Sequence, residues 1–187
     1  MNPFAPILSV FRAIGLAPPP EIERVTMPVM LGELAMRVAL SELGHGETVG
    51  NNRGPDIERY RGGDGTGGSP GGSGAWCASF VSWCFVQLAH QAGLTLPFDT
   101  SRGAKRLAKN IAAAGDRIDP AKAQGGDVIC WHRGKAGSWQ GHVGFVEMRD
   151  RSGLLHTVEG NVGAFPSRVR RLVHDPDHER VYLVARI

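Results

Sequence analysis

Cys77 has a residue type and a position that could support covalent chemistry. It follows a glycine-rich stretch and lies at the start of an apolar run that predicts a buried helix from about Ala75 to Ala92. In the first turn of a helix, free N–H groups and the helix dipole favour negative charge, which lowers the pKa of a thiol. Cys77 could be a nucleophile, a metal ligand, half of a disulfide or a packing residue. The helix alone favours packing.

The two other cysteines are expected to be packing residues. Cys84 lies on the same predicted helix, about 10 Å from Cys77 at a helical rise of about 1.5 Å per residue, which is too far for a disulfide. Cys130 lies in an apolar strand. The sequence contains no CxxC pair, so a structural zinc site is not expected. We expect the thiols to be reduced.

A nucleophilic cysteine needs a base, and His142 is the strongest candidate among the histidines. It follows a glycine on a predicted strand and shares one face with Gly144, whose missing side chain leaves room beside the imidazole. His132 follows a strand end, and His156 could be an ordinary packed histidine. The other histidines occur in polar or loop contexts and are expected at the surface: His45, His90, His174 and His178.

The segment VEGN supplies candidates for a third group that would orient the base. Glu159 and Asn161 are two residues apart on a predicted strand, so both could point to one face and reach one imidazole. By itself, an acid at a strand end is more often simply solvated. The prediction therefore depends on the combination of a thiol at a helix start, Gly-His on one strand and Glu-Gly-Asn at the end of the next.

The elements that must position these residues run from helices to strands along the chain. Helices are predicted from Met30 to Gly44, in DIERYR with Asp56 as the cap, around Cys77, and from Ser101 to Ala114 with Ser101 as the cap. Five β-rich runs follow: GDVICWH, GHVGFVEM, GLLHTVEG, RVRRLV and RVYLVARI. This order predicts an α+β domain with an antiparallel sheet of about five strands.

Glycine occupies eight of the thirteen positions from Gly62 to Gly74. Such a segment has no stiffness of its own. It could cover the site as a lid, or it could be a plain connector between two helices.

Length, charge and the N-terminal segment exclude several classes of protein. The 187 residues suffice for one well-buried core and are few for two. A net charge of +3 without an aromatic-interleaved basic tract gives no reason to expect nucleic-acid binding. The N-terminal segment lacks a positive n-region and is too short to span a membrane. We therefore expect an arm over residues 1–26, a catalytic domain over residues 27–187, and no integral membrane segment.

Four ordered stretches resemble the CHAP family of cysteine amidohydrolases/peptidases and, more broadly, the NlpC-type branch of the papain-like superfamily. They are AWCASFVSWC, GDVICWHR, GHVGFVE and TVEGNVG, and they cover Trp76 to Gly163. The upstream NNRGPDIERYR is similar to the lead-in of many bacterial and phage cell-wall hydrolases. The resemblance implies a papain-like fold in which the nucleophile begins a central helix packed on the sheet.

By this resemblance, Cys77 is the nucleophile, His142 the base and Glu159 the residue that orients the imidazole. Asn161 would assist the imidazole or the oxyanion. The implied substrate is peptidoglycan, cleaved at the N-acetylmuramoyl–L-alanine amide or within the stem peptide or cross-bridge. Further candidates for contact with the substrate are Trp76, Asn52 and Trp131.

The sequence departs from the family pattern in two ways, which limit the family properties that can be expected of this chain. Some CHAP domains bind calcium through acidic residues near the nucleophile, whereas here only Asp64 precedes Cys77 nearby. One carboxylate cannot build a six-oxygen site, so no metal and no cofactor are expected. No cell-wall-binding repeat is recognisable in the sequence.

Two other functions stay open at this point. One is a non-catalytic cell-wall-binding module, and the other is a cysteine hydrolase or transferase that acts on an amide outside peptidoglycan. Peptidoglycan lies outside the cytoplasm, yet no signal peptide is recognised, which suggests a phage lysis enzyme or a delivered effector. On that interpretation the protein acts in the periplasm or cell wall as a monomer. A secretion machinery and an immunity or inhibitor protein are then candidate partners.

Overall fold

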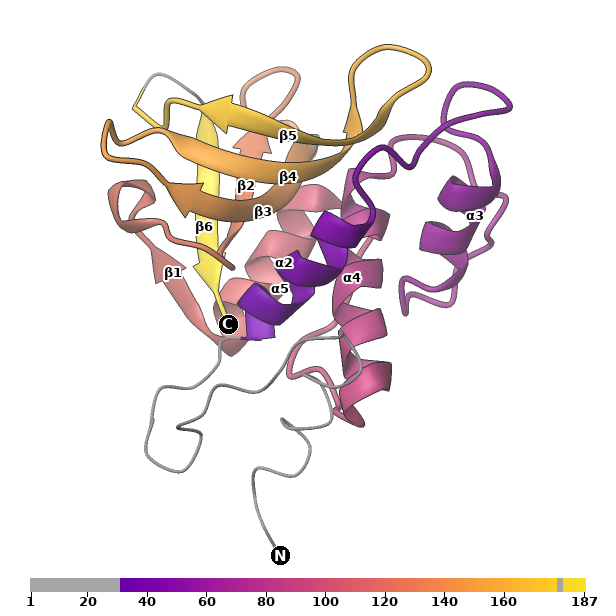
Figure 1. Cartoon of the computed structure of the whole chain (residues 1–187), viewed down its shortest axis with the longest axis horizontal. Helices are drawn as coiled ribbons and strands as arrows, with labels where there is room; N and C mark the ends of the chain where they lie inside the picture. Colours follow the sequence, from indigo (N-terminus) through magenta and orange to yellow (C-terminus); the bar gives the residue numbers. More distant parts are fainter. Residues whose placement is uncertain (1–30, 178–179) are drawn as a thin grey trace, which may run out of the picture.

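The computed structural model describes residues 31–177 and 180–187 (Figure 1). The predicted arm over residues 1–26 and the predicted surface residue His178 lie outside the described residues. None of the described helices is long and apolar enough to cross a membrane.

The strands form one antiparallel sheet in the order β1-β6-β2-β3-β4-β5 (Figure 1). The α+β prediction is confirmed, with six strands in the described residues instead of about five. The additional strand is the short edge strand β1, whose three residues carry no alternating pattern. The strands are β1 (Asp116–Ile118), β2 (Val128–His132), β3 (Gly141–Arg149), β4 (Leu155–Val162), β5 (Arg168–His174) and β6 (Val181–Arg186).

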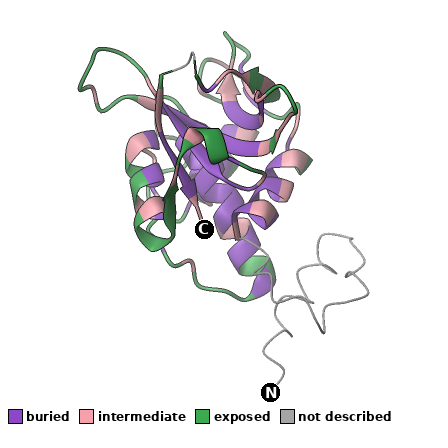
Figure 2. Cartoon of the chain, turned by 90° about the vertical axis from the view of Figure 1, so that its left-hand side faces the viewer, coloured by how far each residue is buried: buried purple, intermediate pink, exposed green. Residues whose placement is uncertain are grey.

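The helices of the described residues are α2 (Leu31–Ser41), α3 (Pro55–Gly62), α4 (Cys77–Ala92) and α5 (Ala104–Ala114), with a 3₁₀ turn, η1 (Pro120–Lys122), before β2. Helix α4 contacts α2, α3 and α5 as well as β3 and β4. Twelve of its sixteen residues are buried, which is why its sequence is apolar nearly all round. Figure 2 shows the buried residues gathered between the helices and the sheet, with exposed residues on the outer loops.

Two predicted helix caps are wrong. The residue before α3 is Gly54, and Asp56 instead accepts hydrogen bonds from the Gly46 N–H at 3.0 Å and from Arg59 at 3.1 Å. Helix α5 begins at Ala104, and Ser101 lies before it, where its hydroxyl accepts from the Gly103 N–H. Asp56 thus holds the distant Gly46 backbone, whereas the Ser101 hydroxyl makes a local contact just before the helix.

The start of α4 packs directly on β4. Gly160 of β4 lies against the rings of Trp76 and Phe80, and a Cβ at this position would come under 3.0 Å from both rings. Trp76 and Phe80 are fully buried and meet edge-to-face, with ring centroids 6.3 Å apart. The missing side chain at Gly160 thus lets the first turn of α4 rest on the end of β4.

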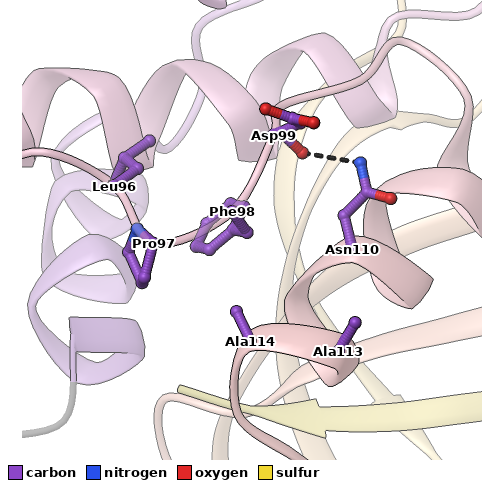
Figure 3. A pocket seen from close by; sticks show the side chains of 7 residues that line it. All are labelled: Leu96, Pro97, Phe98, Asp99, Asn110, Ala113 and Ala114. Carbon is purple, nitrogen blue, oxygen red and sulfur yellow. Dashed lines mark hydrogen bonds between the residues drawn. The ribbon is translucent and has the colours of Figure 1, made fainter.

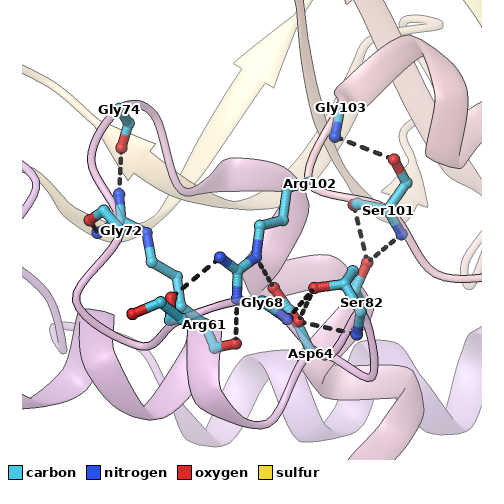
Figure 4. A network of polar contacts seen from close by, with 11 residues as sticks. Arg61, Asp64, Gly68, Gly72, Gly74, Ser82, Ser101, Arg102 and Gly103 are labelled. Carbon is cyan, nitrogen blue, oxygen red and sulfur yellow. Dashed lines mark hydrogen bonds and ion pairs between the residues drawn. The ribbon is translucent and has the colours of Figure 1, made fainter.

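The glycine-rich segment Gly62–Gly74 is tied down by two arginines (Figure 4). Arg61 is 3% exposed, and its guanidinium donates to the carbonyls of Gly72 and Gly74. Arg102 donates to the Ser69 carbonyl at 3.0 Å and pairs with the buried carboxylate of Asp64 at 2.7 Å. Hydrogen bonds from Arg61 and Arg102 therefore hold in place a segment whose glycine-rich composition gives it no stiffness of its own.

Candidate active site

Cys77 is the first residue of α4, and its side chain lies where the helix meets β3. It is 4% exposed. The thiol is hydrogen-bonded to His142 and to the backbone N–H groups of Ala78 and Val143. The apolar run that follows Cys77 buries the helix and so holds the thiol at the edge of the core. Cys84 and Cys130 are fully buried, free thiols.

His142 connects this thiol to a carboxylate. Its Nε2 lies 2.7 Å from Oε2 of Glu159, which leaves Nδ1 as the ring nitrogen for Cys77. His142 is 8% exposed and Glu159 is 1% exposed. The Cys77 thiol, the His142 imidazole and the Glu159 carboxylate thus form one hydrogen-bonded series that is shielded from water.

Gly144 makes the contact between the two strands possible. The side chain of Glu159 leaves β4 and crosses β3 over Gly144 to reach His142. A Cβ at Gly144 would lie under 3.0 Å from Cγ of Glu159 and from the carbonyl oxygen of Val158. The room that the sequence predicts beside His142 is therefore filled by the carboxylate side chain.

The three groups shift one another's pKa toward an ion pair. Burial opposes ionisation of Cys77, but its hydrogen bond to His142 and the charge of His142 outweigh burial and lower the thiol pKa. Burial also opposes charge on His142, but Cys77 and Glu159 raise its pKa to about 10. For Glu159, hydrogen bonds from His142 and His174 overcome burial and lower the pKa to about 2. These shifts favour the charged forms of all three groups: a thiolate, an imidazolium and a carboxylate.

His174 is part of this site, and its prediction as a surface residue is wrong. Its Nε2 lies 2.6 Å from Oε1 of Glu159, and 14% of its side chain is exposed. Oε1 also accepts from the Thr157 hydroxyl at 2.5 Å. The ring of Trp131 packs on both histidines, with its centroid 4.6 Å from that of His174 and 5.8 Å from that of His142. The alternating pattern of RVRRLVH predicts the strand but gives no sign of this contact, because β4 and β5 must first pair.

Asn161 is placed differently from the sequence-based expectation. The register of β4 and β5 shifts between Glu159 and Val162, and Asn161 has a φ of 64°. Simple alternation, which would put Glu159 and Asn161 on one face, does not hold across this bulge. The side-chain oxygen of Asn161 accepts from the Ser167 hydroxyl at 3.0 Å.

Two of the three residues expected to touch the substrate are buried. Trp76 is 0% exposed and Trp131 is 4% exposed, so both pack inside the protein in this structure. Asn52 is half-buried at a turn with a φ of 58°. Its backbone N–H donates to Glu47 at 2.8 Å.

Glu47 is a buried residue that the sequence analysis missed. Its carboxylate accepts hydrogen bonds from the Trp76 indole at 3.2 Å, from the Asn52 N–H at 2.8 Å and from the Ser167 N–H at 2.9 Å. Burial opposes its charge, but these bonds outweigh burial and lower its pKa. Glu47 thereby fixes Trp76, the residue directly before Cys77. The polar loop HGETVGNN gives no sequence signal for this role.

The residues present do not fit a calcium site. Asp64 accepts from Arg102 at 2.7 Å and from the Thr66 hydroxyl at 2.6 Å, so its oxygens are already used. Across residues 31–177 and 180–187, no three or more His, Cys, Asp or Glu side chains are grouped so that they could hold a metal ion.

A separate hollow lies away from these groups, between the segment Leu96–Asp99 and the end of α5 (Figure 3). It has a volume of about 400 Å³. Its polar contact joins the Asn110 amide to the Asp99 carbonyl at 2.8 Å, which ties the loop to the helix. The hollow holds neither a thiol nor a histidine, so we assign it no chemistry.

Alkylation of Cys77 by iodoacetamide is expected to continue below the pH range in which ordinary thiols react, because the reagent attacks thiolates and the pKa of this thiol is lowered. Alkylation should slow as pH falls through the lowered pKa of Cys77, which protonates the sulfur. Above about pH 10, His142 loses its proton and the thiolate loses its paired charge. The measurement is the inactivation rate constant against pH. His142→Ala should move the acid limb up toward the ordinary thiol pKa, and an unmoved limb would contradict the ion pair.

His174→Ala is expected to lower kcat about tenfold and leave KM nearly unchanged, because Oε1 of Glu159 loses a donor that fixes the carboxylate. His174→Gln keeps an N–H donor at similar reach and should recover most of the rate. The measurement is kcat and KM for the three proteins with the same substrate. Equal rates for His174→Ala and the unaltered protein would show that Thr157 alone suffices to hold the carboxylate.

A thiol, an imidazole and a carboxylate bonded in series at the start of a buried helix are the arrangement that nucleophilic cysteine hydrolases use. Residues 69–161 match the family model of the CHAP domain, which confirms the resemblance seen in the sequence. This match supports a function of the peptidoglycan amidase or peptidase type in general. No curated protein and no solved structure matches the chain significantly.

Proposed function

We propose that this protein is a peptidoglycan hydrolase that cleaves an amide bond through a covalent thioester on Cys77. The observation that carries the proposal is the hydrogen-bonded series of Cys77, His142 and Glu159 at the start of α4. The family match supports peptidoglycan as the class of substrate.

In the first half of the reaction, the Cys77 thiolate attacks the carbonyl carbon of the scissile amide. The resulting oxyanion is stabilised by backbone N–H groups, for which the N–H of Cys77 at the helix start is the candidate. His142 gives its proton to the departing amine as the C–N bond breaks, which leaves an acyl group on sulfur. Glu159 holds the imidazole in place through Nε2.

In the second half, water replaces the amine. His142, now neutral, removes a proton from the water, and the hydroxide formed attacks the thioester carbonyl. The C–S bond breaks and the carboxylic acid leaves. Cys77 returns to the thiolate and His142 to the imidazolium, so the ion pair is restored.

Digestion of purified sacculi tests the proposal. We expect soluble muropeptides to appear with the unaltered protein and not with Cys77→Ala. Mass spectrometry of the fragments then identifies the scissile bond: free stem peptides with intact glycan indicate an amidase, and new amino termini within the peptide indicate an endopeptidase. Binding without release would favour a non-catalytic wall-binding module. Neither binding nor release would favour an amide outside peptidoglycan.

The place of action follows from the proposed substrate. Peptidoglycan lies outside the cytoplasm, so we propose that the protein acts in the periplasm or the cell wall, during phage lysis or after delivery as an effector. Fractionation of producing cells, with assay of the wall fraction, is the corresponding measurement.

A further inference from the structure

A groove of about 560 Å³ lies between α5 and the end of the sheet where β3 begins. Helix α5 contributes Lys105, Arg106 and Lys109 to its wall, and β6 contributes Tyr182. Trp139, from the loop between β2 and β3, lies at its edge with 81% of its surface exposed. The groove therefore combines cations with two aromatic side chains.

The positive charges of the groove are not balanced by acids. None of the residues that line it is Asp or Glu, and Lys105, Arg106 and Lys109 have no carboxylate partner among the described residues. Lys105 donates to the Ser138 carbonyl and lies over the Tyr182 ring at 5.1 Å. Arg106 and Lys109 are exposed and lie three residues apart, on one side of the helix. These two side chains are free to bind an anion.

The groove adjoins the start of β3, the strand that carries His142. The stem of Lys105 passes against Gly141, the residue before His142, since a Cβ at Gly141 would lie 3.0 Å from Cγ of Lys105. Gly141 thus brings the wall of the groove to within one residue of His142 along β3.

We propose that this groove is a carboxylate-binding subsite, in which Arg106 and Lys109 bind a free carboxylate of the peptidoglycan stem peptide. The inference rests on the proposed function and deepens it, because it states which part of the substrate is recognised. Arginine and lysine bind carboxylates through charge-assisted hydrogen bonds. The exposed ring of Trp139 provides apolar surface for the adjoining chain.

The test uses two forms of one substrate. Sacculi are freed of attached polymers, and half of the sample is amidated with carbodiimide and ammonia, which converts free carboxylates to neutral amides. We expect the unaltered protein to show an apparent KM five- to tenfold lower for the carboxylate form, with similar kcat for the two forms. The preference should shrink with added salt, which screens exposed charges.

Arg106→Gln/Lys109→Gln should raise the KM for the carboxylate form to that of the amidated form and leave kcat within about twofold. The matched control is Lys122→Gln/Arg151→Gln, which removes the same charge from two exposed residues beyond the opposite ends of β2 and β3. The control should retain the preference.

The outcomes separate the two proposals. If the unaltered protein digests both forms with one KM, or if both double variants behave alike, the subsite is overturned and the hydrolase proposal stands. If the unaltered protein digests neither form, the proposed function fails and the subsite fails with it.

Discussion

Cys77→Ser is expected to lower the release of muropeptides from sacculi by roughly 10⁴-fold, because a nucleophile that acts as a unit with its base cannot be replaced without losing most of the catalysis. The Cys77 thiol ionises readily because His142 and two backbone N–H groups stabilise the thiolate. A serine hydroxyl at the same place does not ionise near neutral pH, and its oxygen is a poorer nucleophile. The measurement is the initial rate of fragment release, followed by chromatography.

Cys84→Ser is the matched control for this substitution. Cys84 lies two turns further along α4, where burial raises the pKa of its thiol well above the usual value. Two turns of helix separate it from Cys77, so the rate per folded molecule should stay within about twofold. Circular dichroism of both variants shows whether they are folded. If Cys77→Ser kept the full rate in folded protein, Cys77 would not be the nucleophile.

Gly144→Ala is expected to have the second largest effect, a loss of roughly 10²-fold or more in kcat/KM. The new methyl group would occupy the space through which Glu159 reaches His142 and would also press on the Val158 carbonyl. The carboxylate would have to leave Nε2 of His142, and the imidazole would lose both its orientation and the charge that raises its pKa. The measurement is kcat/KM together with the pH dependence of Cys77 alkylation.

Two further variants separate the loss of the contact between Glu159 and His142 from general damage to the sheet. Glu159→Gln removes the charge without adding volume, and it should reproduce most of the loss in kcat/KM. Gly71→Ala adds the same methyl group at an exposed position where the nearest atom, the Ser69 hydroxyl oxygen, is 3.9 Å away, and it should leave the rate unchanged. A fully active Gly144→Ala protein would mean that Glu159 is not required next to His142.

Cys77, His142 and Glu159 were predictable as a set, from a thiol at a helix start, Gly-His on one strand and Glu-Gly-Asn at the end of the next. The apolar run after Cys77 specifies a buried helix, and a residue at the start of such a helix lies near free N–H groups whatever the rest of the fold is. Gly-His and the alternating pattern of GHVGFVE indicate a strand with space beside His142. Helix positions and strand runs were likewise predictable from hydrophobic periodicity to within a few residues.

Residues that act through distant partners were not predictable in this way. His174 reaches Glu159 only because β5 pairs with β4, and nothing in the surrounding sequence specifies that pairing. Glu47 looks like a loop acid, yet the fold encloses it and brings together three backbone and side-chain N–H donors. Asn161 departs from alternation because a bulge inserts an unpaired residue into β4.

By itself, the sequence determined the α+β class and a helix from about Ala75 to Ala92, because both follow from short-range periodicity. It also supplied Cys77, His142 and Glu159 as candidates through the order of their motifs along the chain. Only the tertiary structure decided that Glu159 crosses over Gly144 to reach His142 and that His174 shares its carboxylate. Strand register and burial bring these groups within hydrogen-bond distance. Both depend on contacts between segments far apart in the chain, which local sequence does not specify.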